Sequence, residues 1–323
     1  MNIPVFDLHC DSALALLGAS VNEAGSLGKN DLHIDLTRAS ALAGYCQCFA
    51  CFTTPEMEKW HGVSPVVIFE REIATIQREL DANRKKIRIA YTPGDIEANR
   101  EKGLMSAVLT LEGTAGFGHD PELLEDLNLI GFRITSLGWN ESNPLTGSHI
   151  TGEGLSDQGR AYVRKAQQLG MLVDVSHISD RGFWDIMDIT QAPILATHSN
   201  SRSVCGHSRN LTDDMFRAIC ATGGVAGLNL YTEFLDEKGN ADMDTACDHI
   251  FHFMELDPTG RHIALGGDLD GCETLPDGFA GVQDYPKLAA RLLERGLEEK
   301  TIRDIFWNNA IGVMENAVCN HKK

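Results

Sequence analysis

The stretch VFDLHCD at residues 5–11 is a short apolar run that ends in a His-x-Asp pair. Alternate residues of a β-strand point to the same face of the sheet. We therefore expect a buried strand on which His9 and Asp11 can bind one metal ion, with Asp7 one step deeper on the same face. A single His-x-Asp pair is more often ordinary polarity at a strand end than a metal site, so other segments have to supply further ligands.

The composition excludes several classes of protein. The chain has 323 residues, 43% of them hydrophobic, which suits one α/β barrel or two smaller domains. A net charge of −18 and a pI near 5.0 argue against nucleic acid or an anionic membrane as a partner. The sequence contains neither a transmembrane-length apolar run nor a basic and apolar leader. Nine cysteines, an odd number, predict reduced thiols and a cytoplasmic protein.

Apolar segments alternate with helical patterns along the whole chain. Besides the opening stretch, we expect strands at residues 47–52, 104–111, 129–137, 172–176, 194–197, 224–230 and 263–267. Helix-start signals occur at Pro65, Thr92, Asp120, Ser156, Ser179 and Thr212. Eight buried strands alternating with helices are typical of an α/β protein with the (β/α)8 TIM-barrel fold. We predict a single barrel domain over residues 1–323, with loop excursions near 18–35 and 140–154.

A doubly wound sheet would also alternate strands and helices. Such sheets usually bind nucleotides through a glycine fingerprint after the first strand. Here Asp11-Ser12-Ala13 follows that strand, without such glycines. The barrel is therefore the favoured interpretation.

Residues capable of binding metal fall at the ends of several predicted strands, where barrel enzymes place their catalytic groups. Each has an ordinary alternative: His177 can cap a helix, and Glu112 and Asp268 can belong to turns. Those alternatives do not explain why all the residues capable of binding metal lie at the same end of their strands. Six nitrogen or oxygen ligands exceed the four that one zinc ion prefers, which favours two divalent ions sharing a carboxylate. The six are His9, Asp11, Glu112, His177, His198 and Asp268.

The order of the short motifs D-x-H-x-D, E-G, D-V-S-H, T-H-S and G-G-D-x-D-G resembles the renal (membrane) dipeptidase family of zinc metallopeptidases, peptidase family M19 of the amidohydrolase superfamily. The resemblance runs from Asp7 to the final helix. It implies a metallo-dipeptidase in which His9 and Asp11 bind a first zinc ion. Glu112 would bridge the two ions, and His177 and His198 would bind the second.

The resemblance also assigns roles outside the metal ligands. Asp268 would serve the bridging water as general base and would then protonate the leaving amine. Arg209, in the segment CGHSRN at residues 205–210, would bind the C-terminal carboxylate of a dipeptide. A D-residue at the C-terminal position would be tolerated. Apart from the resemblance, the place of Asp7 on the first strand makes it a candidate to orient His9.

One segment departs from the family pattern. Family members commonly carry a histidine after the fourth strand that helps to hold the substrate carbonyl, and Trp139 stands at that position here. We place Trp139 and Asn140 at substrate-binding positions, and we expect His149 to be a solvated loop histidine. The departure leaves two alternatives open: an amidohydrolase acting on an N-acyl amino acid or lactam, and a catalytically silent metal-binding homologue. The apolar final helix allows a homodimer.

Overall fold

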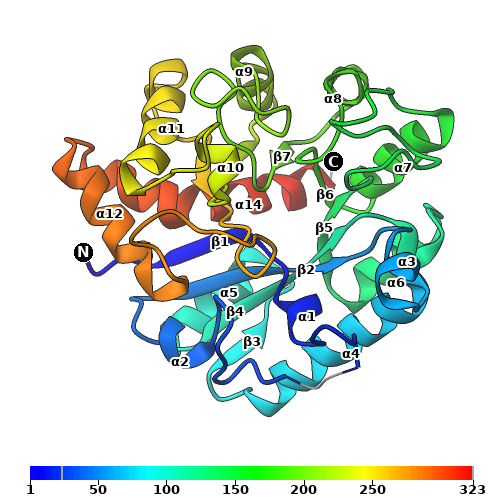
Figure 1. The fold of residues 1–323 in the computed structure, drawn as a ribbon, viewed down its shortest axis with the longest axis horizontal. Helices are drawn as coiled ribbons and strands as arrows, with labels where there is room; N and C mark the ends of the chain where they lie inside the picture. The colour runs from blue at the N-terminus through cyan, green and yellow to red at the C-terminus, as the bar shows by residue number, and fades with distance from the viewer. Residues whose placement is uncertain (23–24, 322–323) are drawn as a thin grey trace.

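The computed structural model describes residues 1–22 and 25–321, with side chains through residue 317. Over that part of the chain it contains nine parallel strands, and Figure 1 shows helices arranged around them. Eight strands close a barrel in the order β1-β2-β4-β5-β6-β7-β8-β9, and β9 pairs back onto β1. The predicted (β/α)8 barrel is confirmed. The strands are β1 (Val5–Cys10), β2 (Tyr45–Phe52), β3 (Ile87–Ile89), β4 (Met105–Glu112), β5 (Phe132–Ser136), β6 (Leu172–Asp174), β7 (Ile194–Ala196), β8 (Val225–Leu228) and β9 (Ile263–Leu265).

Helices cover the outside of the barrel, and Ser or Thr caps begin several of them. Ser64, Thr92, Ser156, Ser179 and Thr212 each accept a hydrogen bond from the backbone three residues on, as their sequence context predicts. The helices are α1 (Ser12–Ala15), α2 (Leu36–Ala39), α3 (Met57–His61), α4 (Pro65–Ala82), α5 (Pro93–Glu101), α6 (Leu123–Ile130), α7 (Asp157–Gln168), α8 (Asp180–Met187), α9 (Asp213–Thr222), α10 (Thr232–Leu235), α11 (Met243–Leu256), α12 (Tyr285–Glu294), α13 (Glu299–Arg303) and α14 (Asn309–His321), with short η1 (Ala115–Phe117), η2 (Val282–Asp284) and π-helical η3 (Asp304–Asn308).

Two boundaries differ from prediction around α6. The helix begins at Leu123 rather than at an Asp120 cap, and the Asp120 side chain accepts a hydrogen bond from the Glu122 backbone. Leu129 and Ile130 belong to this helix and are 76% and 41% exposed, although their apolar character suggested a strand. Gly131, with a φ of 118°, ends the helix, and β5 starts only at Phe132.

The short strand β3 was not predicted. It pairs with the first residues of β4, over Met105–Ala107, whereas β5 pairs with β4 over Leu109–Leu111. Strand β2 lines up with β4 from Ser106 to Glu112. Strand β3 is therefore an addition beside β4 and not one of the eight closing strands. Three residues, with Arg88 exposed in the middle, give too short an alternation to recognise.

The barrel interior is apolar and is closed at its N-terminal end by the last helical segment. Every one of the eight barrel strands contributes to one buried cluster, together with Trp307, Ala310, Val313 and Met314 of η3 and α14. The rings of Phe6 and Trp307 lie 5.9 Å apart. The apolar face of the final helix thus packs within the chain. The strand residues of the cluster are Phe6, Leu8, Cys46, Cys48, Val108, Ile134, Leu172, Leu195, Val225 and Ala264.

The two predicted loop excursions connect barrel elements. Residues 18–22 and 25–35 contain no strand or helix, and Val21, Leu27 and Ile34 anchor them in the core. Residues 23–24 of that excursion lie outside the described residues. The loop between β5 and α7 is joined to the segment after β6 through an isolated bridge between Ser148 and Ile178. Among described residues, no helix has the length and apolarity needed to cross a membrane.

Strand β1 contains an irregularity that changes which face its residues occupy. Asp7 pairs with Gln47 while Cys10 pairs with Phe49, so three steps along β1 match two along β2. This β-bulge interrupts the alternation of side chains. The expectation that Asp7 shares a face with His9 is therefore wrong.

Asp7 is directed to the outer ring of helices. Its carboxylate accepts a hydrogen bond from the hydroxyl of Tyr285 on α12. The other oxygen accepts backbone hydrogen bonds from His9 and Gly267, both at 3.0 Å. Asp7 thus fixes the ends of β1 and β9 relative to each other, and its contact with His9 is through the main chain.

Glycines allow β7, β8 and β9 to approach closely. A Cβ atom on Gly227 would lie 2.0 Å from the carbonyl oxygen of Thr197, and one on Gly266 would lie 1.6 Å from it. A Cβ on Gly224 would lie 1.8 Å from the carbonyl oxygen of Ile194 at the other end of β7. Backbone atoms cannot move aside as a flexible side chain can, so only glycine fits at these positions.

We expect Gly224→Ala to lower the free energy of unfolding by about 1–3 kcal/mol or more, because the new methyl group overlaps backbone. The matched control is Gly312→Ala in α14, where a Cβ would meet nothing within 4 Å. That variant should gain about 0.5–1 kcal/mol from helix propensity. Urea unfolding followed by circular dichroism measures both. If Gly224→Ala is as stable as the parent, the close contact between residue 224 and the carbonyl oxygen of Ile194 is not present in the protein.

Candidate active site

Four strand ends bring the predicted ligands together around Glu112, the last residue of β4. Its Oε1 lies 2.8 Å from Nε2 of His177, which follows β6. Its Oε2 lies 3.2 Å from Nε2 of His9, near the end of β1. The two oxygens of one carboxylate therefore face two different histidines. Glu112 thus lies between two groups of possible ligands.

Each side of Glu112 carries its own group of donor atoms. On one side, Nε2 of His9 lies 3.4 Å from Oδ2 of Asp11 and 3.8 Å from Oδ1 of Asp268. On the other, the Nε2 atoms of His177 and His198 are 2.9 Å apart. The sets His9–Asp11–Asp268 and His9–Glu112–His198 each have donor atoms within 4.8 Å of one another, close enough to hold a metal ion. The six residues predicted from separate strand ends thus lie at one site.

Hydrogen bonds fix the protonation of His177 and His198. Nδ1 of His177 lies 2.9 Å from Oδ1 of Asn140, an acceptor, so Nδ1 carries the proton. Thr197 donates its hydroxyl proton to Asp174 at 2.8 Å and therefore accepts from Nδ1 of His198, also at 2.8 Å. Both Nε2 atoms consequently present lone pairs to each other. A cation is the group that such facing lone pairs require.

Two further buried atoms at the site lack a hydrogen-bond partner. Nε2 of His9 and Oδ1 of Asp11 are buried without a hydrogen-bond partner. Burial opposes protonation of His9, but the carboxylates of Glu112 and Asp11 raise its pKa well above the usual value. Burial, reinforced by Glu112, raises the pKa of Asp11 to about 6. The donor set, carboxylates with imidazoles in a buried pocket, fits divalent metal ions such as zinc.

His177 and His198 are neutral in the metal-free protein. Burial, together with the positive charges of Arg209 and His9, lowers the pKa of His177 and His198 well below the usual value. Neutral imidazole is the form that binds metal. These two histidines can therefore act as ligands without first losing a proton.

Asp268 stands beside the ligand cluster in a constrained loop. Its backbone has a φ of 58°, and its Oδ2 accepts a hydrogen bond of 3.0 Å from Asn229. A Cβ on Gly271 would lie 2.6 Å from Oδ1 of Asp268 and 2.0 Å from Oδ2 of Asp11, so this glycine lets the loop close over both carboxylates. Burial raises the pKa of Asp268 to about 7, a value suited to giving and taking protons near neutral pH.

Arg209 is a buried cation that points into the site. It is 3% exposed, and its Nη2 lies 3.1 Å from Nε2 of His177. The guanidinium stands 5.3 Å from the ring centroid of Phe234, and its Nε has no hydrogen-bond partner. Burial lowers the pKa of Arg209 to about 10, which still leaves it charged at neutral pH. It can therefore receive an anionic group of a ligand.

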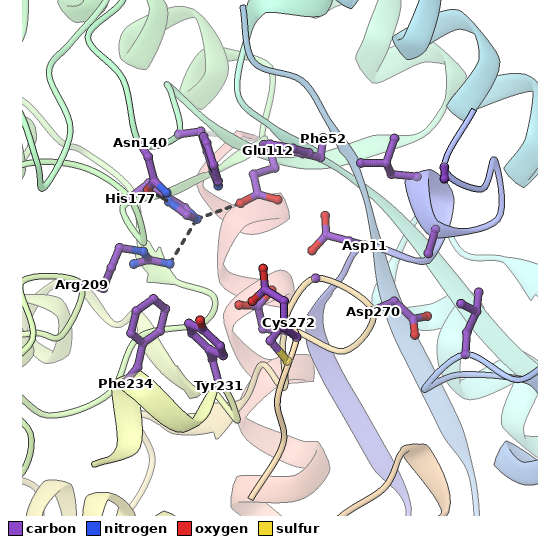
Figure 2. Close-up of a pocket in the computed structure, with 18 of the residues that line it drawn as sticks. Asp11, Phe52, Glu112, Asn140, His177, Arg209, Tyr231, Phe234, Asp270 and Cys272 are labelled. Atoms are coloured by element: carbon purple, nitrogen blue, oxygen red, sulfur yellow. Dashed lines mark hydrogen bonds and ion pairs between the residues drawn. The ribbon is translucent and has the colours of Figure 1, made fainter. Parts of the chain in front are cut away.

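A cavity of about 690 Å³ opens onto these groups. Figure 2 shows Glu112 and His177 along one wall, Arg209 at one end and Asp11 toward the other. Trp139 and Asn140 also line the cavity, and the Trp139 ring lies 6.1 Å from the His177 ring.

His149 is not the solvated residue that we expected. Its Nε2 lies 3.0 Å from Oδ1 of Asn140, and its Nδ1 lies 2.8 Å from the hydroxyl of Ser208. Burial, with Arg209 nearby, lowers its pKa to about 3, so it is neutral. His149 thus supports Asn140 from behind and does not line the cavity.

Sequence reasoning missed three supporting residues. Asp174 and Thr197 fix the orientation of His198, and Asn229 holds Asp268. The first two stand inside the motifs D-V-S-H and T-H-S, so their positions were visible although their role was not. Asn229 follows β8, and a polar residue at a barrel-strand end was the available signal.

A (β/α)8 barrel with a carboxylate–imidazole cluster at the C-terminal ends of its strands defines a metal-dependent hydrolase. Residues 1–323 match the family model of membrane dipeptidase, peptidase family M19. The chain belongs to this family and is a metallo-dipeptidase.

Relatives agree in sequence. An uncharacterized protein from the pqqA 5' region of Klebsiella pneumoniae is 32% identical over 267 residues, which cover 78% of this chain and 97% of that protein. An uncharacterized dipeptidase of Schizosaccharomyces pombe is 33% identical over 225 residues, 68% of this chain. The match spans 55% of the yeast protein, so this chain corresponds to about half of its length.

Solved structures agree as well. A metallo peptidase from Rhodobacter sphaeroides, bound to a phosphinate mimic of the dipeptide L-Ala-D-Ala, has a TM-score of 0.88 at 27% identity, with 98% of this chain and 100% of that chain covered. The dipeptidase AC structure, a metallo peptidase of family M19, has a TM-score of 0.88 at 28% identity, with 98% and 99% covered.

Metal binding should release protons. His9 is protonated at neutral pH in the metal-free protein because its pKa is raised, and coordination requires the neutral ring. Calorimetric zinc titrations in buffers of different ionisation enthalpy should show net proton release near pH 8, to which the His9 imidazole contributes. The number of protons released should rise, and the affinity for zinc should fall, as the pH is lowered to about 6.5, where Asp268 and Asp11 also bind protons.

The control is His9→Gln, which keeps His177 and His198 but has no imidazole proton to lose. Its proton release at about pH 8 should be smaller than that of the parent by about one. Zinc binding to the parent without proton release would contradict the assignment of His9 as a ligand.

Proposed function

We propose that the enzyme hydrolyses the peptide bond of dipeptides with a free C-terminal carboxylate, at a site for two zinc ions. The observation that carries the proposal is the placement of Glu112 between two groups of donors, each facing one of its oxygens. His9 and Asp11 would hold the first ion, His177 and His198 the second, and Glu112 both. When bound, two zinc ions would supply a bridging hydroxide and would polarise the scissile carbonyl.

Arg209 is proposed to bind the substrate carboxylate. It is buried and charged, and it retains an unpartnered donor. A guanidinium matches a carboxylate through two parallel hydrogen bonds. Its position beside His177 would place the C-terminal residue at that end of the cavity, with the peptide bond over Glu112.

Asp268 is proposed to move the proton. Its carboxylate takes a proton from the attacking water and later gives it to the leaving amine, for which a pKa near the working pH is the most effective. Asn229 holds one of its oxygens, which leaves the other directed toward His9. Asp268 thus directs one oxygen into the site beside His9.

Trp139 and Asn140 are proposed to shape substrate choice. Trp139 can donate a single hydrogen bond and offers an apolar face, while Asn140 orients His177. Tolerance of a D-residue at the C-terminal position is supported by the R. sphaeroides metallo peptidase, whose ligand mimics L-Ala-D-Ala. Trp139 also favours a second candidate, hydrolysis of N-acyl amino acids or lactams. The presence of Asp268, the proposed proton-transfer group, argues against a homologue that binds metal without catalytic activity.

We also propose a cellular setting for the protein. Eight cysteines of the described chain are free thiols, which supports a cytoplasmic location. The apolar face of α14, which allowed a homodimer, is buried against the barrel and lends that prediction no support.

Asp268→Asn should reduce kcat by about 10²–10⁴-fold, because the amide cannot accept the proton. Zinc content, measured by mass spectrometry, should stay close to that of the parent. The control Asp126→Asn removes an exposed carboxylate on α6 and should leave kcat unchanged. Near-normal kcat in zinc-loaded Asp268→Asn would refute its role.

Arg209→Met should raise KM for L-Ala-L-Ala and L-Ala-D-Ala by about 10–100-fold, the cost of losing charge-assisted hydrogen bonds. For the parent, KM should rise by a similar factor when the C-terminal carboxylate of the dipeptide is replaced by an amide. For Arg209→Met, KM should be nearly the same for the dipeptide and for its amide. A parallel screen with N-acetyl-alanine and a lactam separates the alternatives. Turnover of these compounds with negligible turnover of every dipeptide would favour the second candidate function.

A further inference from the structure

A further group of side chains that can bind metal lies at the N-terminal end of the barrel, away from the catalytic cavity. It consists of Cys220 in the last turn of α9, Asp257 directly after α11 and His262 directly before β9. One donor atom from each residue, a sulfur, a carboxylate oxygen and a ring nitrogen, lies within 4.8 Å of the other two. All three residues are partly exposed, so an ion can reach them from solvent.

The packing of the outer helices brings the three residues together. Figure 1 shows α9 and α11 as neighbours in the outer ring, and the rings of Phe216 and Phe253 stack between them with centroids 4.2 Å apart. After α11 the chain turns back through residues 257–262 into β9. An ion held by the group would therefore join the end of α9 to the turn between α11 and β9.

A hydrogen bond outside the group fixes the tautomer of His262. Its Nδ1 lies 2.7 Å from the carbonyl oxygen of Gly224, an acceptor, so Nδ1 carries the proton and Nε2 keeps its lone pair. Histidines that bind metal are usually oriented in this way, with the second ring nitrogen donating to a backbone carbonyl or a carboxylate. His262 is thus already in a form that can bind a metal ion.

The turn that carries Asp257 holds its carboxylate in place. Oδ1 accepts hydrogen bonds from the backbone and the hydroxyl of Thr259, at 3.1 and 2.6 Å. Oδ2 accepts a longer hydrogen bond of 3.3 Å from the backbone of His262. Because a carboxylate has about four acceptor positions, Asp257 retains lone pairs for an ion.

A Cys-His-Asp group also suggests a nucleophilic thiol. Such a thiol needs a lowered pKa, commonly from a neighbouring positive charge. Burial, together with the carboxylate of Asp257, raises the pKa of Cys220 to about 12 instead. The thiol is therefore protonated near neutral pH and is a poor nucleophile, whereas a divalent cation would displace the proton and bind the thiolate.

We propose that Cys220, Asp257 and His262 form a zinc site that is separate from the catalytic one and stabilises the fold. Thiolate, imidazole and carboxylate are the ligands of zinc in proteins, with bonds of about 2.0–2.3 Å, and water completes the coordination. At these bond lengths the donors of one tetrahedral ion are roughly 3.3–3.8 Å apart, so the side chains draw together by up to about 1 Å. The thiolate and the carboxylate balance the charge of the ion. Catalytic groups of a barrel stand at its other end, so binding here should leave kcat unchanged.

Cobalt(II) separates this site from the catalytic one, because none of the proposed catalytic ligands contains sulfur. The full chain, depleted of metal and titrated with cobalt(II), should show thiolate-to-cobalt charge-transfer absorption in the near ultraviolet. Cys220→Ala should abolish this band. The matched control is Cys272→Ala, which removes a thiol that lines the catalytic cavity and should keep the band. His262→Gln should lower the cobalt affinity of the site by about tenfold or more.

Zinc content gives a second measurement. After equilibration with buffered free zinc, mass spectrometry should find about one zinc ion per chain fewer in Cys220→Ala than in the parent. Asp257→Asn leaves every thiol in place and should show the same deficit. Zinc should also raise the midpoint of urea unfolding more in the parent than in either variant.

Three results would overturn the site: absence of the charge-transfer band from the parent, a band that survives Cys220→Ala, or equal zinc content in the parent and both variants. None of these results depends on the proposed dipeptidase activity. A parent that shows the band but hydrolyses no dipeptide would refute the proposed function and leave the zinc site in place.

Discussion

The carboxylate of Glu112 is the constraint around which the site is organised. One oxygen stands 3.2 Å from His9 and the other 2.8 Å from His177, so a single side chain of β4 connects donors supplied by opposite parts of the barrel. Asp11 and Asp268 lie on the same side as His9, and burial raises the pKa of both. Crowding carboxylates in a buried pocket is costly unless a cation compensates them. Among the described residues of the site, only Arg209 and a protonated His9 supply positive charge, and the donor geometry suits metal ions.

A second layer of hydrogen bonds and close backbone contacts keeps these donors in place. Asp174 and Thr197 hold His198, while Asn140, supported by His149, holds His177. Glycines at 227 and 266 let two neighbouring strands approach the Thr197 carbonyl, which positions the residue immediately before His198. The β-bulge in β1 turns Asp7 outward to Tyr285 and leaves His9 facing the mouth. Side-chain polarity and backbone clearance therefore act together, since a ligand is only as well placed as the strand end that carries it.

The repeating pattern of apolar strands and capped helices was sufficient to predict the barrel, because burial on both faces makes each parallel strand a continuous apolar run. Convergence of Glu112, His177 and Asp268 followed from the rule that strand ends of a barrel meet at one mouth. The bulge at β1 was not predictable from alternation, so Asp7 was placed on the wrong face. Strand β3 was too short, and Leu129 and Ile130 are apolar residues on an exposed helix face, where local character misleads. The role of His149 depends on contacts with Asn140 and Ser208, which come from the tertiary structure alone.

The cavity has a polarity that matches a dipeptide better than an N-acyl amino acid. Its cation, Arg209, stands at one end, and the carboxylates of Asp11 and Asp270 stand toward the other. A dipeptide is a zwitterion with the same separation of charge, whereas an acyl group or lactam has no ammonium to face the Asp270 carboxylate. Trp139 changes this argument little, since its indole packs on Phe52 and adds an apolar wall without adding charge. Under the proposed function, loss of an ionisable side chain at that position would bear on how the carbonyl is held, while the charges at the two ends of the cavity would orient the substrate.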